Sequence, residues 1–251
     1  MSPGVLALLV LAAFLAGVVD AIAGGGGLVT LPALLATGLP PHVAIATNKG
    51  QAVFGVLASY LRFRRAGMID AERARVAFPA GFAGSLAGAA LLLHVSPQAL
   101  KPLVLALLLA VAAFLAFRRP GPPRRRARPL PPGPTAAAVA LVIGCYDGFF
   151  GPGTGTFLIV AFVALLGDGL AQASASAKVV NLASNLAAFA LFAWRGTVLW
   201  HLALPMAAGQ MSGSWVGAHL AVKRGDAFVR KVVLAVVAAL VAKLGRDLLV
   251  R

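Results

Sequence analysis

Charged residues are scarce in this sequence, and acids are scarcer still. Only 12% of its 251 residues are charged, with 7 Asp and Glu against 22 Lys and Arg. A soluble domain carries about 25% charged residues, so the surface of a water-soluble protein could not be built from this chain. Hydrophobic residues make up 60% of the chain, and its mean hydropathy is +0.91. The composition therefore indicates a membrane protein.

Motifs that carry catalytic chemistry are also lacking. Cys145 is the single cysteine, which excludes an intramolecular disulfide. The chain contains no HExxH, no Gly-x-Ser-x-Gly and no phosphate-binding GxxxxGK[ST] motif, and its histidines are scattered near the ends of apolar runs. We therefore expect no catalytic residue, no metal site, no cofactor and no direct use of ATP by this chain, so that an intramembrane enzyme is disfavoured.

Apolar runs recur along the chain, and basic residues gather at their ends. The basic groups lie at 62–75, 118–128 and 223–231, where the positive-inside rule places cytoplasmic loops. The net charge of +15 is therefore explained by contact with anionic lipid headgroups, and no nucleic-acid partner is expected. We predict a multi-pass protein of the cell inner membrane. The apolar runs cover 5–19, 76–93, 103–117, 136–145, 179–193, 199–222 and 232–244.

An internal repeat organises the sequence. Residues 17–31 (GVVDAIAGGGGLVTL) match residues 144–158 (GCYDGFFGPGTGTFL) at an offset of 127, and residues 46–49 (ATNK) match 175–178 (ASAK) at an offset of 129. We predict a first transmembrane repeat at 1–118, a basic Pro/Gly-rich cytoplasmic linker at 119–134, and a second transmembrane repeat at 135–251.

The two repeats predict the same all-α plan. Each has an apolar helix (4–22 and 136–149), a glycine-rich break, a helix too short to span the bilayer (27–37 and 155–167) and a longer helix with polar residues (42–63 and 172–194). Two ordinary spans follow (75–94 and 98–118; 198–222 and 227–248). Loop charges nearly tie between parallel and inverted repeats, and we favour the inverted arrangement because it is common in transporters.

The repeated glycine breaks suggest an anion site. Gly24–Gly27 and Gly151–Gly155 each precede a short helix, whose N-terminus offers free N–H groups and the positive end of a dipole. Anions bind such ends, and transporters hold anionic groups at broken helices near the bilayer centre. The competing interpretation is that these glycines only permit close helix packing, which we prefer for Gly84/Gly88 and Gly213/Gly217.

Lys49 and Lys178 occupy equivalent positions inside apolar helices. A lysine near the bilayer centre costs about 2.5–3.5 kcal/mol on insertion scales, so a bound anion would account for both, although either could instead extend to the headgroups. Polar residues accompany the two lysines. Ser174, Lys178, Asn181 and Asn185 share one helix face, Asn48, Gln51, Gly55 and Ser59 form another, and hydrogen bonding between helices is the alternative role for both faces.

Asp20 and Asp147 are the acids that recur in the apolar segments of both halves, each four residues before its break. An intramembrane carboxylate can carry a proton because burial disfavours its charged form. The same carboxylate could instead pair with a lysine and stay ionised, or cap the following turn. Both residues are therefore candidates for proton coupling, with these alternatives open.

The segments AGGGGLVTLPALLATGLPPHVAIATNK and YDGFFGPGTGTFL, with NLASNLAA further on, resemble the TauE/SafE family, also called sulfite exporters. The resemblance spans essentially the whole chain and implies a secondary transporter of a small sulfur-containing anion, sulfite or an organosulfonate, coupled to protons. The family's glycine-rich and Asn-Lys segments correspond to Gly24–Gly27, Asn48-Lys49, Gly151–Gly155 and Lys178, but Ala177 precedes Lys178 where Asn48 precedes Lys49.

The expected substrate site lies between the repeats. Alternatives are another small anion or metabolite as substrate, and a non-transporting membrane partner subunit. Expected partners are the anion, protons and membrane lipids, and the sequence leaves a homo-oligomer open. The expected substrate-binding residues are Gly25, Gly26, Gly27, Thr30, Asn48, Lys49, Gln51, Gly153, Thr154, Gly155, Thr156, Lys178, Asn181 and Asn185.

Overall fold

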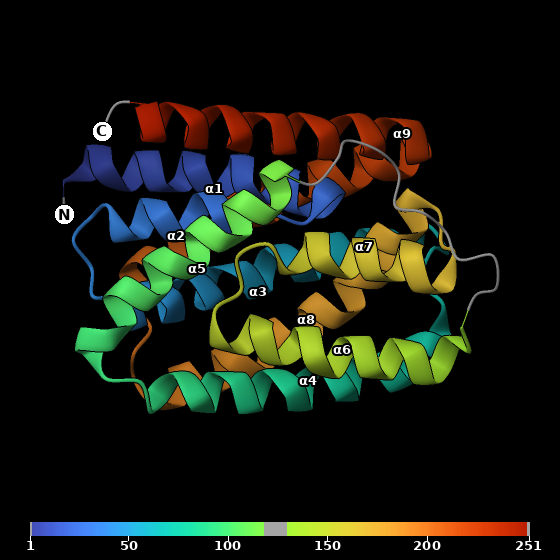
Figure 1. The fold of residues 1–251 in the computed structure, drawn as a ribbon, viewed down its shortest axis with the longest axis horizontal. Helices are drawn as coiled ribbons and strands as arrows, with labels where there is room; N and C mark the ends of the chain where they lie inside the picture. The colour runs from blue at the N-terminus through green and yellow to red at the C-terminus, as the bar shows by residue number, and fades with distance from the viewer. Residues whose placement is uncertain (1, 118–129, 250–251) are drawn as a thin grey trace.

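The computed structural model describes residues 2–117 and 130–249, and there the chain forms helices and no strand (Figure 1). Of the predicted linker at 119–134, residues 119–129 lie outside the described residues. Its last three residues belong to α6. The helices are α1 (Pro3–Ala23), α2 (Gly27–Leu35), α3 (Pro41–Arg65), α4 (Ala71–Leu93), α5 (Pro97–Phe117), α6 (Pro132–Phe149), α7 (Thr154–Leu166), α8 (Leu170–Trp194) and α9 (Trp200–Leu249).

These helices confirm the predicted all-α polytopic membrane protein. Three of those described, α1, α4 and α8, are long and apolar enough by length and composition to cross a bilayer. The two spans expected at 198–222 and 227–248 appear as one element, α9, which is interrupted at Gly225 by non-helical backbone angles (φ 63°, ψ −161°). The predicted boundary between those spans therefore coincides with a break in α9.

The main helix pairs join one half of the chain to the other. Helix α1 packs along the first part of α9, and α4 packs along α6. Their contacts are made by glycines: a Cβ at Gly17 would lie 2.5 Å from the Gln210 carbonyl oxygen, and one at Gly88 would collide with the Cys145 carbonyl oxygen. Lipid tails are as apolar as leucine, so such close backbone packing, rather than burial from water, holds membrane helices together.

The helices of the two halves run in opposite directions. In Figure 1, α1 runs from left to right, whereas α6, the corresponding first helix of the second half, runs from right to left. Helix α1 is parallel to the first part of α9, since Gly209, Gly213 and Gly217 meet Val10, Phe14 and Val18 in register. This arrangement is the one that an inverted repeat would produce.

Basic residues gather at one end of the bundle. The loop after α3, the α7–α8 loop and the α9 break meet there: Gln172 Nε2 donates to the Met68 carbonyl oxygen (2.9 Å), and Ala171 N–H donates to Asp226 Oδ1 (2.8 Å). Arg73 bridges the carboxylates of Asp70 (3.0 Å) and Asp168 (2.7 Å). The groups at 62–75 and 223–231 thus share one end, which is the arrangement that the positive-inside rule predicts for loops on the same side of a membrane.

Asp70 caps α4 at this basic end. Its carboxylate accepts a hydrogen bond from the Arg73 backbone N–H (3.0 Å). That bond, together with the Arg73 guanidinium, lowers the pKa of Asp70 below its ordinary value. An ionised cap at the N-terminus of a membrane helix fixes where the helix starts.

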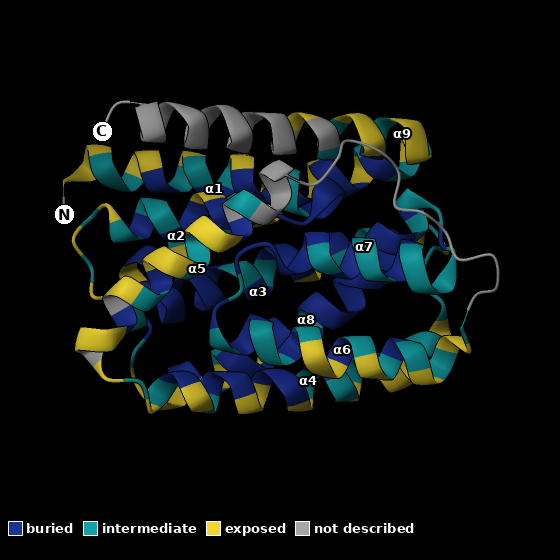
Figure 2. Cartoon of the chain, viewed as in Figure 1, coloured by how far each residue is buried: buried dark blue, intermediate teal, exposed yellow. Residues whose placement is uncertain are grey.

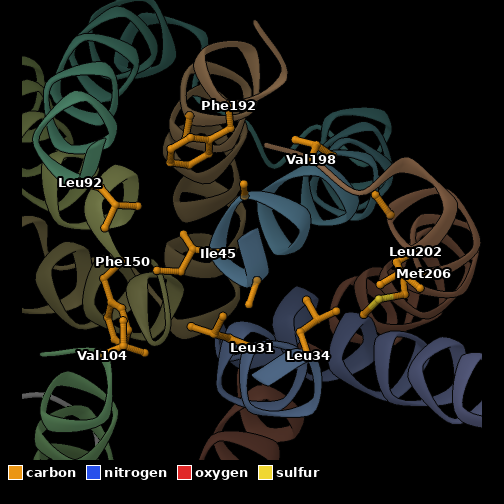
Figure 3. Close-up of a cluster of buried hydrophobic side chains, with 14 of the residues drawn as sticks. Leu31, Leu34, Ile45, Leu92, Val104, Phe150, Phe192, Val198, Leu202 and Met206 are labelled. Carbon is orange, nitrogen blue, oxygen red and sulfur yellow. The ribbon is translucent and has the colours of Figure 1, made fainter. Parts of the chain in front are cut away.

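The opposite end is closed by apolar side chains. Leu34, Ile45, Leu92, Phe192 and Leu202 come from five helices and point toward one another (Figure 3). Between the two ends, α3 and α8 form the centre of the bundle, largely buried in Figure 2, while α4, α5 and α6 carry exposed residues on their outer sides. Of the α8 span, 72% is buried, against 33% for α1, so the polar helix is the inner one.

Candidate functional site

The first helix break turns the chain at Gly24. Helix α1 ends there with a left-handed glycine (φ 71°), and α2 starts three residues later at Gly27. Asp20 reaches across the break, where its Oδ1 accepts the Gly26 N–H at 3.3 Å. Thr30 closes the first turn of α2 by donating to the Gly26 carbonyl oxygen (3.2 Å). The break thus leaves the N-terminus of α2 facing the interior.

The second break follows the same plan with more side-chain support. Gly151 (φ 97°) and Gly153 (φ 85°) take left-handed angles that favour glycine, and α7 starts at Thr154. The Thr154 hydroxyl lies 3.0 Å from Asp147 Oδ1 and also bonds the Gly151 carbonyl oxygen (2.6 Å). The N-terminus of α7 is therefore anchored directly to the carboxylate of the preceding helix.

The two breaks touch each other. Thr156 N–H donates to the Gly24 carbonyl oxygen (2.8 Å), and the Thr156 hydroxyl lies 3.0 Å from the Ala23 carbonyl oxygen. A Cβ on Gly155 would lie 2.5 Å from Gly24 Cα. Glycine is required at both positions because the two backbones cross in direct contact.

Each lysine pairs with the acid of the other half. Lys49 Nζ lies 2.7 Å from Asp147 Oδ1, and Lys178 Nζ lies 2.8 Å from Asp20 Oδ2. The lysines are 2% and 0% exposed, so neither extends to the headgroups. The alternative in which the acids pair with lysines is the one the structure adopts, and the pairs cross the interface between the halves.

The breaks and the first ion pair line a small cavity of about 40 Å³, which is room for about three water molecules. Polar groups dominate its wall. The N-termini of α2 and α7 lie at this wall, although most of their first-turn N–H groups already donate to carbonyl oxygens of the breaks. The lining residues are Asp20, Gly24, Gly25, Gly26, Gly27, Thr30, Asn48, Lys49, Ala52, Val56, Asp147, Gly151, Gly153, Thr154, Gly155, Asn181, Asn185 and Gln210.

Most residues expected at the substrate site meet at this cavity, and three do not. Gln51 lies behind Asn48, to whose Oδ1 its Nε2 donates (3.0 Å). Thr156 is used in the crossing of the breaks. Lys178 turns toward α1, where its Nζ also donates to the Asp20 carbonyl oxygen (2.5 Å). The structure therefore places one of the two lysines, Lys49, at the cavity wall.

Three lining residues were missed by sequence reasoning: Ala52, Val56 and Gln210. Gln210 is the polar one, 2% exposed, and it interrupts the apolar run at 199–222. Its counterpart at the repeat offset is Gly81, so a comparison of the halves passes over it. The signal was a lone carboxamide inside a membrane span, which marks a functional position by default.

Two carboxamides that line the cavity have unsatisfied oxygens. Asn181 Oδ1 and Gln210 Oε1 are buried without a hydrogen-bond partner among the described residues. A buried unpaired polar atom is costly, and such atoms at a cavity indicate a missing partner. A carboxamide can present either its donor or its acceptor end, so these groups suit a polar ligand.

The polar face of α8 contacts both a neighbouring helix and the cavity. The Ser174 hydroxyl donates to the Ala21 carbonyl oxygen at 3.0 Å, which is a bond between helices. Asn181 and Asn185 line the cavity, and Asn185 Nδ2 bonds the Asn181 carbonyl oxygen (2.7 Å) and lies 3.4 Å from Asp147 Oδ2. One helix face thus joins α1 at one end and the cavity at the other.

Known proteins resemble this chain along nearly its whole length. The family model described as "Sulfite exporter TauE/SafE" matches residues 9–244. A "Probable membrane transporter protein ORF9" of Sinorhizobium sp is 38% identical over 96% of this chain and 93% of that protein. A "Probable membrane transporter protein" of Haemophilus influenzae is 38% identical over 96% and 95%, and "YfcA" of Escherichia coli K12 is 36% identical over 98% and 92%. No solved structure matches the chain.

Proposed function

The chain belongs to the sulfite exporter TauE/SafE family and is therefore a membrane transporter and not an enzyme, and we propose that it carries a small sulfur-containing anion, of the sulfite or organosulfonate class, coupled to protons. The observation that carries this proposal is the convergence of two broken helices and Lys49 on one buried cavity. The positive ends of the two helix dipoles and the ammonium group of Lys49 favour negative charge there.

Charge balance supports proton coupling. The two ion pairs contribute two positive and two negative charges, so the site is neutral before the anion enters. Adding an anion alone would leave a net negative charge in a medium of low dielectric, where uncompensated charge is expensive. A proton bound together with a monovalent anion restores neutrality. The buried carboxylates Asp20 and Asp147 are the groups that could accept it.

The shape of the cavity fits an occluded state of the transport cycle. Its volume of about 40 Å³ is too small for an organosulfonate, so substrate entry requires the halves to move apart. The ion pairs and the crossing of the breaks lie at the interface between the halves, where transporters with inverted repeats change their access. We place the protein in the inner membrane with its basic end in the cytoplasm.

The test is transport by the purified protein. Reconstituted liposomes should take up one of labelled sulfite, small sulfonates or thiosulfate in preference to sulfate, and faster with an inward proton gradient. Preference for another anion would favour the alternative substrate class. Absence of uptake of any anion, by protein that is folded and inserted, would remove the proposed function.

A charge-matched pair of variants ties transport to the cavity. Lys49→Gln should abolish uptake because it removes the ammonium group at the cavity wall, and Lys49→Arg should retain part of it. Arg195→Gln removes the same charge from the exposed end of α8 and should leave uptake unchanged. Uptake at the wild-type rate by folded Lys49→Gln protein would contradict this site.

A further inference from the structure

The two buried carboxylates are held very differently. Asp147 is surrounded by four donor groups: Lys49 Nζ (2.7 Å), the hydroxyls of Thr154 (3.0 Å) and Ser184, and Asn185 Nδ2 (3.4 Å). Its side chain is 4% exposed. Neutralising this carboxylate would weaken several charge-assisted hydrogen bonds at once.

Asp20 has fewer partners and more access. Its carboxylate accepts from Lys178 Nζ (2.8 Å) and from the Gly26 N–H (3.3 Å), and its side chain is 13% exposed. Both carboxylates line the cavity, and Asp20 is the more exposed of the two. Asp20 can therefore change its protonation state at a smaller loss of hydrogen bonds than Asp147.

Lys49 and Lys178 differ in how far each depends on its partner carboxylate. If Asp20 becomes neutral, Lys178 keeps a second acceptor, the Asp20 carbonyl oxygen at 2.5 Å. If Asp147 becomes neutral, Lys49 loses the counter-charge on the one hydrogen-bond acceptor that it has among the described residues. A buried ammonium without a partner is strongly destabilising. Neutralisation is tolerated in the first pair and penalised in the second.

Few charged groups face Asp20. Lys178 approaches it from α8, and Lys49 and Asp147 lie across the cavity on α3 and α6. The cavity-lining residues of α2, α7 and α9 bring no titratable side chain, since they are glycines, threonines and Gln210. The protonation of Asp20 is therefore governed by Lys178 and by whatever occupies the cavity.

We propose that Asp20 takes up and releases the coupling proton, while Asp147 stays ionised and positions Lys49. This inference rests on the proposed function. A proton on Asp20 removes one negative charge, and a monovalent anion beside Lys49 adds one, so the net charge of the site remains zero. Anion and proton then stabilise each other's binding in the cavity.

The experiment compares two kinds of transport in liposomes containing Asp20→Asn protein. Exchange of labelled for unlabelled anion at equal pH needs the substrate site but no net proton movement, so the variant should retain it. Accumulation driven by a proton gradient should be lost. Asp20→Glu should recover part of the gradient-driven accumulation, because it restores a titratable group.

Two controls separate the roles of the acids. Asp147→Asn should lose both exchange and gradient-driven accumulation, because Lys49 is no longer positioned. Asp70→Asn makes the same change at the cap of α4, outside the cavity, where Asn caps as well as Asp, and it should lose neither. If Asp20→Asn does not fold, the double variant Asp20→Asn/Lys178→Met removes the buried pair together and takes its place.

The outcomes distinguish this inference from the proposed function. Wild-type protein that moves no anion refutes the proposed function. Gradient-driven accumulation that persists in Asp20→Asn, or that is lost in Asp147→Asn while exchange survives, overturns the assignment of the proton to Asp20 and leaves anion transport standing. Loss of both activities by folded Asp20→Asn protein also overturns it, because a proton carrier is not needed for exchange.

Discussion

The two helix breaks share one plan but differ at three positions around their carboxylates. In the second half, the polar groups of Thr154, Ser184 and Asn185 all lie within hydrogen-bonding distance of Asp147. Their counterparts at the repeat offsets are Gly27, Gly55 and Val56, none of which has a polar side chain. The same backbone arrangement therefore builds a cage of donors around Asp147 and a more open wall around Asp20.

The two breaks show how one backbone arrangement can provide a charge that stays fixed and a charge that changes with protonation. Gly55 also makes room on the open side, since a Cβ there would collide with Gln210 Cγ. The carboxamide of Gln210 thus occupies space that a caging side chain would fill. In our proposal, differences between the halves, rather than their likeness, divide the tasks of anion and proton binding.

The largest expected effect concerns stability. Asp147→Ala leaves Lys49 buried without its carboxylate and should destabilise the protein by about 3–5 kcal/mol. Asp20→Ala should cost less, because Lys178 retains the carbonyl oxygen of residue 20. Thermal unfolding in one detergent checks the order. Equal losses, or a larger loss for Asp20→Ala, would contradict the difference that we draw between the two pairs.

An intermediate effect is expected from glycines of the two breaks. Gly155→Ala places a methyl group 2.5 Å from Gly24 Cα and should cost about 1–3 kcal/mol through overpacking, with loss of anion binding as the breaks separate. At Gly25 the nearest atom to an added Cβ is 3.8 Å away, so Gly25→Ala should fold like the wild type. If both variants unfold at the same temperature, the breaks do not cross as described.

The smallest effect tests a single member of the cage. Thr154→Val keeps the shape of the side chain and removes the hydroxyl that bonds Asp147 (3.0 Å). A lost hydrogen bond of this kind is worth about 1 kcal/mol, so the unfolding temperature should fall slightly while exchange persists. A loss as large as that of Asp147→Ala would mean that Thr154 alone holds the carboxylate.

The sequence predicted the elements better than their partners. Apolar runs and glycine breaks located the helices to within a few residues, because hydrophobic length and backbone freedom are local properties. The repeat showed that Lys49 and Lys178 are equivalent but not which acid each would meet. That pairing depends on how the halves interlock, with Lys49 and Asp147 separated by 98 residues.

The candidate site was predicted in outline, and its asymmetry was not. Both lysines were expected to face the anion, yet Lys178 is used in binding α1 and lies outside the cavity wall. Gln210 was missed because its counterpart is a glycine. Periodicity places a residue on a helix face, but the neighbouring helix decides whether that face meets a ligand or a backbone.

The central claim is that an anion binds beside Lys49 where the two broken helices meet. Its most direct measurement is anomalous X-ray scattering from crystals of the protein grown with selenite, an oxyanion that resembles sulfite and carries a heavier scatterer. We predict a selenium peak between the N-termini of α2 and α7, within reach of Lys49 Nζ, and no such peak in Lys49→Gln crystals. A peak elsewhere, or an empty cavity at saturating selenite, would contradict the claim.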